Sequence, residues 1–381
     1  MEGIEQNLAL RLAQRQQQGL LRQLVKIPAE AVDFCSNDYL GIGRVTASPN
    51  ASLPSATGSR LISGNSREAE QLEAYLAEFH WAQAGLLFNS GYDANLGLWS
   101  CIAGPEDTIL TDELVHASII DGVRLSKAKR AIFRHNDLAY LESLLQKAQG
   151  NVFIGTESVF SMDGDISPLA EMAKLAKRYD AGLIVDEAHS NGIVGPQGRG
   201  LICELGLKDS VFARVHTFGK AVGRHGAIVL GSDTLKQYLL NFARSFIFTT
   251  ALPPRAVAEI GHAYQLVEAA DEARIRLQAL ANFFVAQRQQ SPWRWLASKT
   301  WIQSVIIPGN QQVRRVARAL EQQGFALKPI VSPTVPAGTE RIRICLHSYN
   351  QEEEIARLFD SLNLLHHKLC EDTSSLALAQ K

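Results

Sequence analysis

Short apolar runs alternate with segments of helical hydrophobic spacing between about residues 60 and 250. Seven of the runs have the length of strands and lie at 84–89, 107–110, 130–133, 151–158, 182–189, 211–218 and 227–232. Helical segments include 66–80, 138–148 and 167–179, and the last begins with Ser and Pro followed by an acidic first turn, a helix start signal. Because near-continuous apolar strands are typical of a sheet buried on both faces, the pattern predicts an α/β domain with a mostly parallel sheet.

The pattern changes after about residue 256. An Ala-, Arg- and Gln-rich helical stretch continues to about residue 290 without an intervening strand. Two strand–helix pairs follow, and they predict a small α+β domain; the pairs are 300–309 with 310–325 and 341–348 with 351–367. We therefore expect an N-terminal helical segment at 1–35, a large domain at 36–262, a small C-terminal domain with its linking helix at 263–370, and a tail at 371–381.

Composition narrows the class of protein. The 381 residues are 46% hydrophobic and 20% charged, with a net charge of −1, so the chain has no electrostatic bias toward nucleic acid or anionic membranes. Its five cysteines stand singly with no CxxC pair, which argues against a zinc site or disulfide framework and suits a reducing cytosol. The first residues predict an amphipathic helix without a signal-peptide core, and no segment has membrane-spanning length; we expect a cytoplasmic protein that holds no metal.

The letters DEAH at 186–189 also occur in helicase-type NTPases. Those enzymes need a preceding phosphate loop of the form GxxxxGK[ST]. The Gly-Lys pair here, 219–220, comes after DEAH and is followed by Ala221, and the chain contains no GxGxxG. The sequence therefore argues against an NTPase.

Asp186, His189 and Lys220 form a more informative set. Asp186 ends an apolar run, at the strand end where open α/β sheets place functional groups. Alone it could be a helix cap or a charge partner for a ligand. His189 follows closely, and Lys220 comes after the next predicted strand. A lysine that forms a Schiff base, a carboxylate for the pyridinium nitrogen and a third group near the ring oxygen are what pyridoxal phosphate chemistry requires.

Two further segments could complete such a site. The stretch FNSGYDANLGLW (88–99) reads as a strand, a Ser-Gly turn and a helix, whose free N–H groups could hold a phosphate. An ordinary strand–helix turn would look the same. His116 lies at an expected helix start, where its imidazole could stack on a flat ring or simply be a polar surface residue.

Eight segments, in order and spacing, resemble the α-oxoamine synthase family of fold-type I pyridoxal-phosphate enzymes, which are class II aminotransferase-like. The resemblance covers about residues 20 to 365, and the segments are FCSNDYLG (34–41), GSRLISGNS (58–66), LFNSGYDAN (87–95), DELVHASIIDG (112–122), ESVFSMDGD (157–165), VDEAHSNGIVGPQGRG (185–200), HTFGKAVGRHGA (216–227) and FIFTTALPP (246–254). It implies the fold-type I architecture: a large α/β domain with a mostly parallel central sheet and a small C-terminal α+β domain.

The resemblance implies a role for each matching residue. Four would be catalytic: Lys220 as the cofactor-attaching lysine, Asp186 at the pyridine nitrogen, His189 at the phenolic oxygen and His116 stacked on the ring. Others would bind the cofactor: Ser90, Gly91 and Tyr92 in the phosphate-side turn, Thr217 near the phosphate or lysine, Ser161 near the ring, and Thr250 reaching the phosphate of the partner subunit. The last assignment implies a homodimer with shared active sites.

Asn37 and Arg343 would bind substrate. Period-two alternation sends Arg341 and Arg343 to the same side of their predicted strand, where a surface position is the ordinary alternative. An arginine on a strand can also hold a substrate carboxylate with two parallel hydrogen bonds. The resemblance selects Arg343 for that role.

The activity implied is a decarboxylative condensation of an amino acid with an acyl thioester. We expect L-alanine with a pimeloyl group carried on coenzyme A or on acyl carrier protein. A sister enzyme that uses glycine or serine, of the 2-amino-3-ketobutyrate, 5-aminolevulinate or sphingoid-base type, would keep the same residues. A scaffold that retains the fold without turnover is a third possibility. Two turns, SATGSR (55–60) and GRHGA (223–227), depart from the family's Gly-Ser-rich pattern where the acyl donor or partner subunit is expected.

Overall fold

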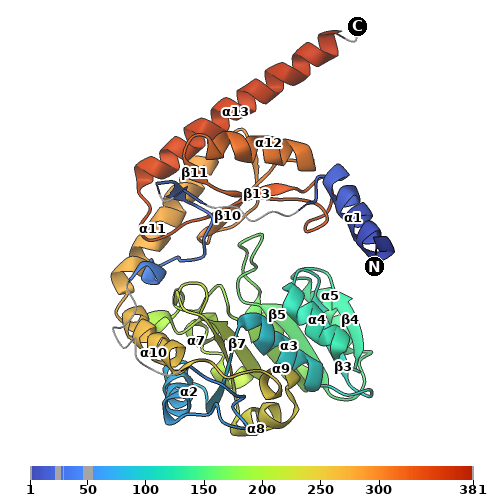
Figure 1. The fold of residues 1–381 in the computed structure, drawn as a ribbon, viewed down its shortest axis with the longest axis vertical. Helices are drawn as coiled ribbons and strands as arrows, with labels where there is room; N and C mark the ends of the chain where they lie inside the picture. The colour runs from blue at the N-terminus through green and yellow to red at the C-terminus, as the bar shows by residue number, and fades with distance from the viewer. Residues whose placement is uncertain (1, 22–26, 29, 46–54, 380–381) are drawn as a thin grey trace. The chain divides into compact units, whose positions relative to one another are not determined.

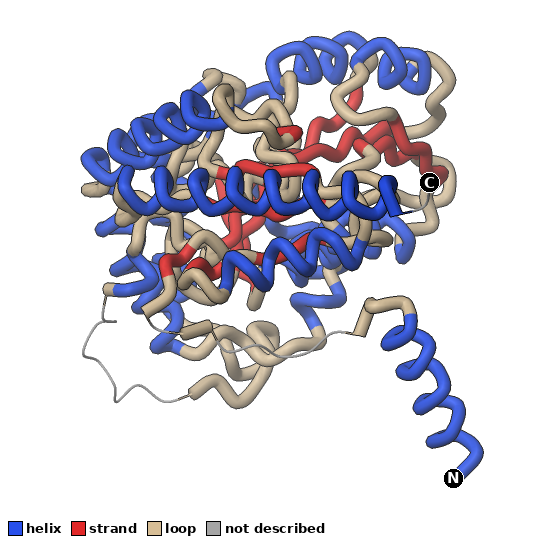
Figure 2. Tube along the Cα trace, turned by 90° about the horizontal axis from the view of Figure 1, so that it is seen from above, coloured by secondary structure: helices blue, strands red, loops and turns tan. Residues whose placement is uncertain are grey.

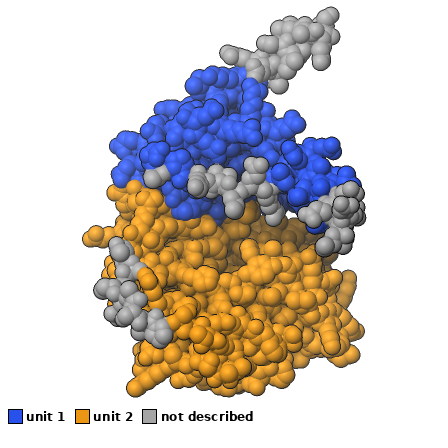
Figure 3. Space-filling model, viewed as in Figure 1, with its two compact units in different colours: residues 1–36, 280–346, 350–381 blue, residues 37–279, 347–349 orange. Residues whose placement is uncertain are grey.

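The chain is divided into two compact units. The computed structural model describes residues 2–21, 27–28, 30–45 and 55–379. The larger unit comprises residues 37–279 and 347–349, and the smaller unit comprises residues 1–36, 280–346 and 350–381 (Figure 3). The predicted domain boundaries remain predictions, because compactness of a chain trace does not establish that its parts fold independently.

A seven-stranded sheet forms the centre of the larger unit (Figure 1). Its order is β2-β8-β7-β6-β5-β3-β4, and its strands are β2 (Ala84–Phe88), β3 (Thr108–Asp112), β4 (Lys129–Phe133), β5 (Val152–Glu157), β6 (Ala181–Asp186), β7 (Ala213–Thr217) and β8 (Ala227–Gly231). Only the two pairs that involve β8 are antiparallel. The predicted α/β fold with a mostly parallel sheet is therefore confirmed, and each predicted apolar run overlaps one of these strands.

Helices cover both faces of this sheet. Successive residues of a strand point to opposite faces, and the apolar residues of the two faces form two separate core clusters with the helices. Ile109 packs with apolar residues of α3 (Gly91–Cys101), α4 (Ala117–Leu125) and α8 (Asp233–Phe242). The next residue, Leu110, packs with those of α5 (Leu138–Leu145), α6 (Leu169–Arg178) and α7 (Leu201–Glu204). Figures 1 and 2 show this layering. The helices of the larger unit are η1 (Ile42–Arg44), α2 (Arg67–Phe79), α3 (Gly91–Cys101), α4 (Ala117–Leu125), α5 (Leu138–Leu145), α6 (Leu169–Arg178), η2 (Pro196–Gly198), α7 (Leu201–Glu204), η3 (Lys208–Ser210), α8 (Asp233–Phe242), α9 (Arg244–Ile247) and α10 (Pro254–Glu268).

Helix α11 (Asp271–Arg288) leads from the larger unit into the smaller one, whose antiparallel sheet has the order β12-β13-β10-β9. A short parallel pair, β1-β11, completes its strands. The elements of the smaller unit are α1 (Glu2–Gln17), β1 (Val32–Asp33), β9 (Arg294–Trp295), β10 (Ile302–Ile306), α12 (Asn310–Glu321), β11 (Phe325–Ala326), β12 (Lys328–Ile330), β13 (Arg341–Cys345) and α13 (Glu352–Ala379). The backbone of α13 thus includes most of the predicted tail; residues 380–381 lie outside the described part of the chain. None of the described helices has both the length and the apolar character needed to cross a bilayer.

A half-buried histidine, His135, forms a clamp that joins the end of β3 to the loop after β5. The Nδ1 atom of His135 lies 3.0 Å from Asp112 Oδ1, and its Nε2 atom lies 2.7 Å from Asp165 Oδ2. Burial disfavours a charged imidazole, but the hydrogen bonds and charges of the two carboxylates outweigh this effect and raise the pKa of His135 to about 10. The clamp is therefore an imidazolium between two carboxylates at neutral pH.

We expect His135→Gln to lower the free energy of unfolding by about 2 kcal/mol at pH 7, since the buried carboxylate of Asp112 loses a charged donor. A pKa raised from 6.5 to about 10 gives stability that is fully present below pH 6.5 and is lost as the pH rises through 10. Urea denaturation should show that His135→Gln lowers the free energy of unfolding less at pH 10 than at pH 7. Arg134→Gln, which removes an exposed ion pair with Asp137, is the control and should change little. An equal deficit at both pH values would contradict the charged clamp.

Candidate active site

A cavity of about 170 Å³ lies within the larger unit, at the carboxyl ends of β5, β6 and β7. It brings together seven of the residues singled out from the sequence, namely Gly91, Tyr92, His116, Asp186, His189, Thr217 and Lys220. The remaining lining residues are Asn95, Ser118, Glu157, Ala188 and Val215. A lysine, two carboxyl groups and two imidazoles therefore line one cavity.

Asp186, the last residue of β6, is held by two hydrogen bonds. Its Oδ2 atom accepts from Asn95 Nδ2 at 2.7 Å, and its Oδ1 atom accepts from the main-chain N–H of Ala188 at 2.9 Å. The residue is only 7% exposed. It thus caps the turn after its strand and also presents a fixed, hydrogen-bonded carboxyl group at the cavity. The structure thus shows a turn cap in place of the possible helix cap, and the role of Asp186 as a charge partner for a ligand stays a prediction.

His116 is the N-cap of α4, so the imidazole is locked where the helix begins. Its Nδ1 atom accepts from the main-chain N–H of Ser118 at 3.2 Å and lies 2.7 Å from the Ser118 hydroxyl. Burial lowers the pKa of His116; the negative charge of Asp186 acts against this, and the positive charge of Lys220 acts with it. An imidazole with a lowered pKa is neutral at physiological pH.

His189 is fixed through a tyrosine from the start of the larger unit. The hydroxyl of Tyr39 lies 2.8 Å from His189 Nδ1 and donates to Asn37 Oδ1 at 3.0 Å. The Tyr39 hydroxyl therefore lies between the side chains of Asn37 and His189 and holds the imidazole in place. Asn37 is therefore connected to the cavity through Tyr39, although it is not among the lining residues.

The turn before α3 closely approaches the end of β7. Ser90 is the N-cap: its hydroxyl accepts from the N–H of Asp93 at 3.1 Å and donates to the Asp93 carboxylate at 2.8 Å. A Cβ atom on Gly91 would lie 3.1 Å from Thr217 Cβ, so the absence of a side chain permits this approach. Tyr92 is 43% exposed, and its hydroxyl donates to Asp121. The first turn of α3 and the Thr217 hydroxyl thus border the same part of the cavity.

Lys220 lies in the loop that joins the antiparallel strands β7 and β8. The loop is fastened by hydrogen bonds from the N–H of Phe218 to the carbonyl of Gly226, at 2.9 Å, and from the N–H of Gly223 to the carbonyl of Lys220, also at 2.9 Å. Gly223 has a φ of +66°, and a Cβ atom there would lie 2.4 Å from the main-chain nitrogen of Gly43. The small residues around Lys220 therefore fulfil a backbone requirement as well as a packing one.

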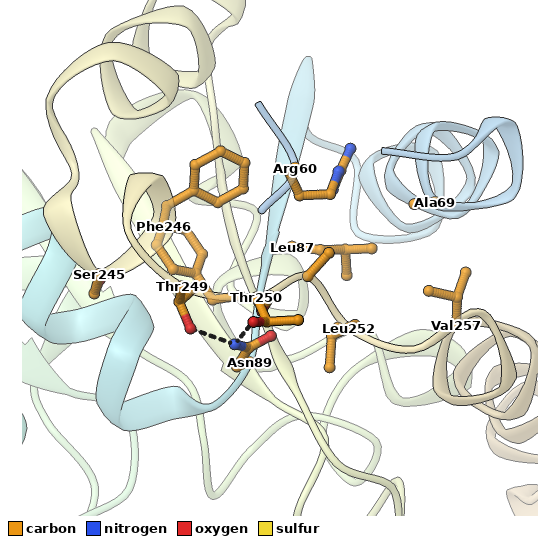
Figure 4. A pocket seen from close by; sticks show the side chains of 12 residues that line it. Arg60, Ala69, Leu87, Asn89, Ser245, Phe246, Thr249, Thr250, Leu252 and Val257 are labelled. Carbon is orange, nitrogen blue, oxygen red and sulfur yellow. Dashed lines mark hydrogen bonds between the residues drawn. The ribbon is translucent and has the colours of Figure 1, made fainter. Parts of the chain in front are cut away.

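Besides Ser90 and Asn37, three residues expected at the site are not among those that line the cavity. Ser161 follows β5 but is not among the described residues that line the cavity. Thr250 borders a separate small hollow with Arg60 and Asn89, and its carbonyl accepts from Asn89 Nδ2 at 2.9 Å (Figure 4). Arg343 is on β13 of the smaller unit, paired with Ser304 and Lys328 of the neighbouring strands. Their expected contacts with cofactor or substrate remain predictions.

The sequence interpretation missed Glu157, Asn95, Ser118 and Tyr39. Glu157 could have been found by the argument that selected Asp186, because it also ends an apolar strand. Asn95 and Ser118 lie inside helical segments, where one polar residue among many carries no local signal. Tyr39 is distant in sequence from the histidine that it holds.

Comparisons with known proteins agree along nearly the whole chain. A sequence profile described as "Aminotransferase class I and II" matches residues 29–362. The 8-amino-7-oxononanoate synthase of Marinobacter nauticus is 40% identical over 375 residues, covering 93% of this chain and 95% of that protein. The structure of an 8-amino-7-oxononanoate synthase from Francisella tularensis is similar with a TM-score of 0.77 and 30% identity, covering 90% of this chain and 99% of that one. A serine palmitoyltransferase variant from S. paucimobilis with a bound PLP–myriocin aldimine has a TM-score of 0.84 and 27% identity, covering 94% and 96% of the two chains.

The charges around His116 predict opposite responses to two substitutions. Asp186→Asn removes a negative charge that raises the pKa of His116, so that pKa should fall further. Lys220→Gln removes a positive charge that lowers it, so that pKa should rise. Nitrogen-detected NMR of labelled histidine in the two variants, without added ligand, measures both shifts. Shifts of the same sign would show that the imidazole does not respond to these two charges.

Proposed function

Because the chain belongs to the class I and II aminotransferase family, we propose that it is a pyridoxal-phosphate-dependent acyltransferase of the 8-amino-7-oxononanoate synthase type. It would condense L-alanine with a pimeloyl thioester, release carbon dioxide, and so contribute to biotin biosynthesis. The observation that carries the proposal is the gathering of Lys220, Asp186, His116 and His189 around one cavity.

The residues present fit pyridoxal phosphate. Lys220 offers an amine for covalent attachment, and Asp186 offers a carboxyl group that two hydrogen bonds hold in place for the ring nitrogen. The N–H groups at the start of α3 suit the phosphate, since a helix N-terminus carries partial positive charge. Gly91 leaves room beside Thr217 that a side chain would fill. Ser90, Tyr92 and the Thr217 hydroxyl would complete this end of the site.

Bound pyridoxal phosphate would supply an electron sink for the α-carbon of the amino acid. The protein residues would position the reactants and move protons. Asp186 would keep a negative charge beside the ring nitrogen, and His189 would hydrogen-bond the ring oxygen. The neutral imidazole of His116 would lie against the ring face. The Nζ atom of Lys220, once released from the cofactor, would accept the proton from the substrate α-carbon as a general base.

Substrate recognition extends the proposal to residues outside the cavity. We assign the substrate carboxylate to Arg343, whose guanidinium can form two parallel hydrogen bonds, and place Asn37 near the substrate. Ser161 would lie near the ring, and Thr250 would reach the phosphate of the partner subunit in a homodimer. The acyl group would arrive on coenzyme A or on acyl carrier protein, and the reaction would take place in the cytoplasm.

Covalent attachment is tested at Lys220. Borohydride treatment of the purified protein should fix one pyridoxal group to the peptide that contains Lys220, as mass spectrometry can show. Lys220→Ala should lose this label and lower kcat by roughly 100-fold or more, because both the attachment and the base are removed. Lys208→Ala, on the exposed surface, is the control and should keep both. A labelled Lys220→Ala protein would refute the assignment.

Substrate trials test the rest of the proposal. With pimeloyl-CoA or the pimeloyl carrier protein, kcat/KM for alanine should exceed that for glycine by at least about tenfold, the value of one methyl group in a fitted pocket. Mass spectrometry should identify 8-amino-7-oxononanoate and released carbon dioxide. Turnover with glycine or serine and another acyl-CoA, but not with alanine, would instead identify a sister synthase.

A further inference from the structure

Glu157 occupies the place beside Asp186 at the end of the adjacent strand. The two residues are paired in the parallel register of β5 and β6. Side chains of paired residues in neighbouring strands project from the same face of a sheet, and both residues line the cavity. Glu157 is only 3% exposed. The site therefore contains two buried carboxyl groups side by side, and the mechanism above uses one of them.

The two carboxyl groups have unequal hydrogen bonding. Asp186 accepts from Asn95 and from the N–H of Ala188. The Oε1 atom of Glu157 is buried and has no hydrogen-bond partner among the described residues. An ionised carboxylate with an unsolvated, unbonded oxygen is costly, and a neutral carboxylic acid avoids most of that cost.

The surrounding charges act in the same direction. Burial raises the pKa of Glu157 to about 8, and the negative charge of Asp186 on β6 adds to the rise. Lys220, after β7, and the main-chain N–H of His116, at the start of α4, act against it, whereas Asp112 on β3 raises it further. His189 also borders the cavity. Asp186 and Asp112 thus act on the pKa of Glu157 in one direction, and Lys220 acts in the other.

We infer that Glu157 is a positioning residue held as a neutral carboxylic acid, which leaves Asp186 as the single full negative charge among the described lining residues. Glu157 lines the same cavity as His116, the residue that caps α4. The meaning of this for catalysis rests on the proposed function. The negative charge of Asp186 would balance the positive charge of the protonated ring nitrogen of pyridoxal phosphate. A second negative charge, on Glu157, would change the ionisation of the bound cofactor.

The first test uses the full-length chain stripped of cofactor. Between pH 5 and pH 8 the unfolded chain ionises Glu157 while the folded chain keeps it protonated, so wild-type stability is lost across this range as the pH rises. Glu157→Gln stays neutral and escapes that loss. The Tm of the variant minus the Tm of the wild type should therefore increase by roughly 5 °C when the pH is raised from 5 to 8. Glu73→Gln is the matched control, because it removes a buried glutamate that is ion-paired with Arg60 and Lys236, and it should lower Tm at both pH values.

A difference between wild type and Glu157→Gln that stays constant with pH, or a variant that loses stability as Glu73→Gln does, would overturn the inference. If Glu157→Gln fails to fold, infrared difference spectra of the wild type between pH 6 and pH 9 decide. A protonated carboxyl band that disappears on the alkaline side supports the neutral acid, and no such band refutes it.

The second test separates this inference from the proposed function. With pyridoxal phosphate bound, the visible absorbance of the wild type should show an alkaline transition that Glu157→Gln lacks. If the stability result holds but the protein binds no pyridoxal phosphate, the proposed function fails and the neutral Glu157 stands. If pyridoxal phosphate binds and the absorbance titrates identically in both proteins, the inference fails and the proposed function stands.

Discussion

The parallel register of β5, β6 and β7 is the constraint on which the site depends. This register aligns Glu157 with Asp186 and Asp186 with Val215. All three strands therefore end at the same edge of the sheet. A slip of one residue would turn Asp186 toward the opposite face of the sheet, into a cluster of aliphatic side chains. The apolar burial of both faces therefore fixes the position of the polar residues at the strand ends.

The helices complete what the register begins. Helix α3 carries Asn95 to Asp186, and the N-cap of α4 supplies His116, with Asn95 also donating to the hydroxyl of Ser118 at 3.1 Å. Gly122 of α4 is packed so closely against α3 that a Cβ atom would lie 2.7 Å from Trp99 Cβ. The packing of α3 against α4 thus also sets the positions of the polar side chains at the site. A substitution that moves one helix would displace these side chains as well.

Much of this could be predicted from the sequence because the signals are local. Each strand of the larger unit is visible in the sequence as an apolar run. Polar residues at or after the ends of such runs indicate the edge of the sheet where the cavity lies, and this argument selected Asp186 and Lys220. The strands of two or three residues in the smaller unit, such as β1 and β11, are too short to show a period. Contacts such as Tyr39 with His189 depend on how distant segments meet. The small hollow that contains Thr250 was unforeseen for the same reason.

The loop that carries Lys220 differs from the others at this edge, since it joins two antiparallel strands that are both central in the sheet. Both of its ends are tethered by ladder hydrogen bonds, and the glycine conformations within it set its path. Gly223 and Gly226 both have positive φ values, so the backbone favours glycine at these two positions of the GRHGA turn. The exposed His225 carries no such requirement, and a change there leaves the path of the loop around Lys220 intact.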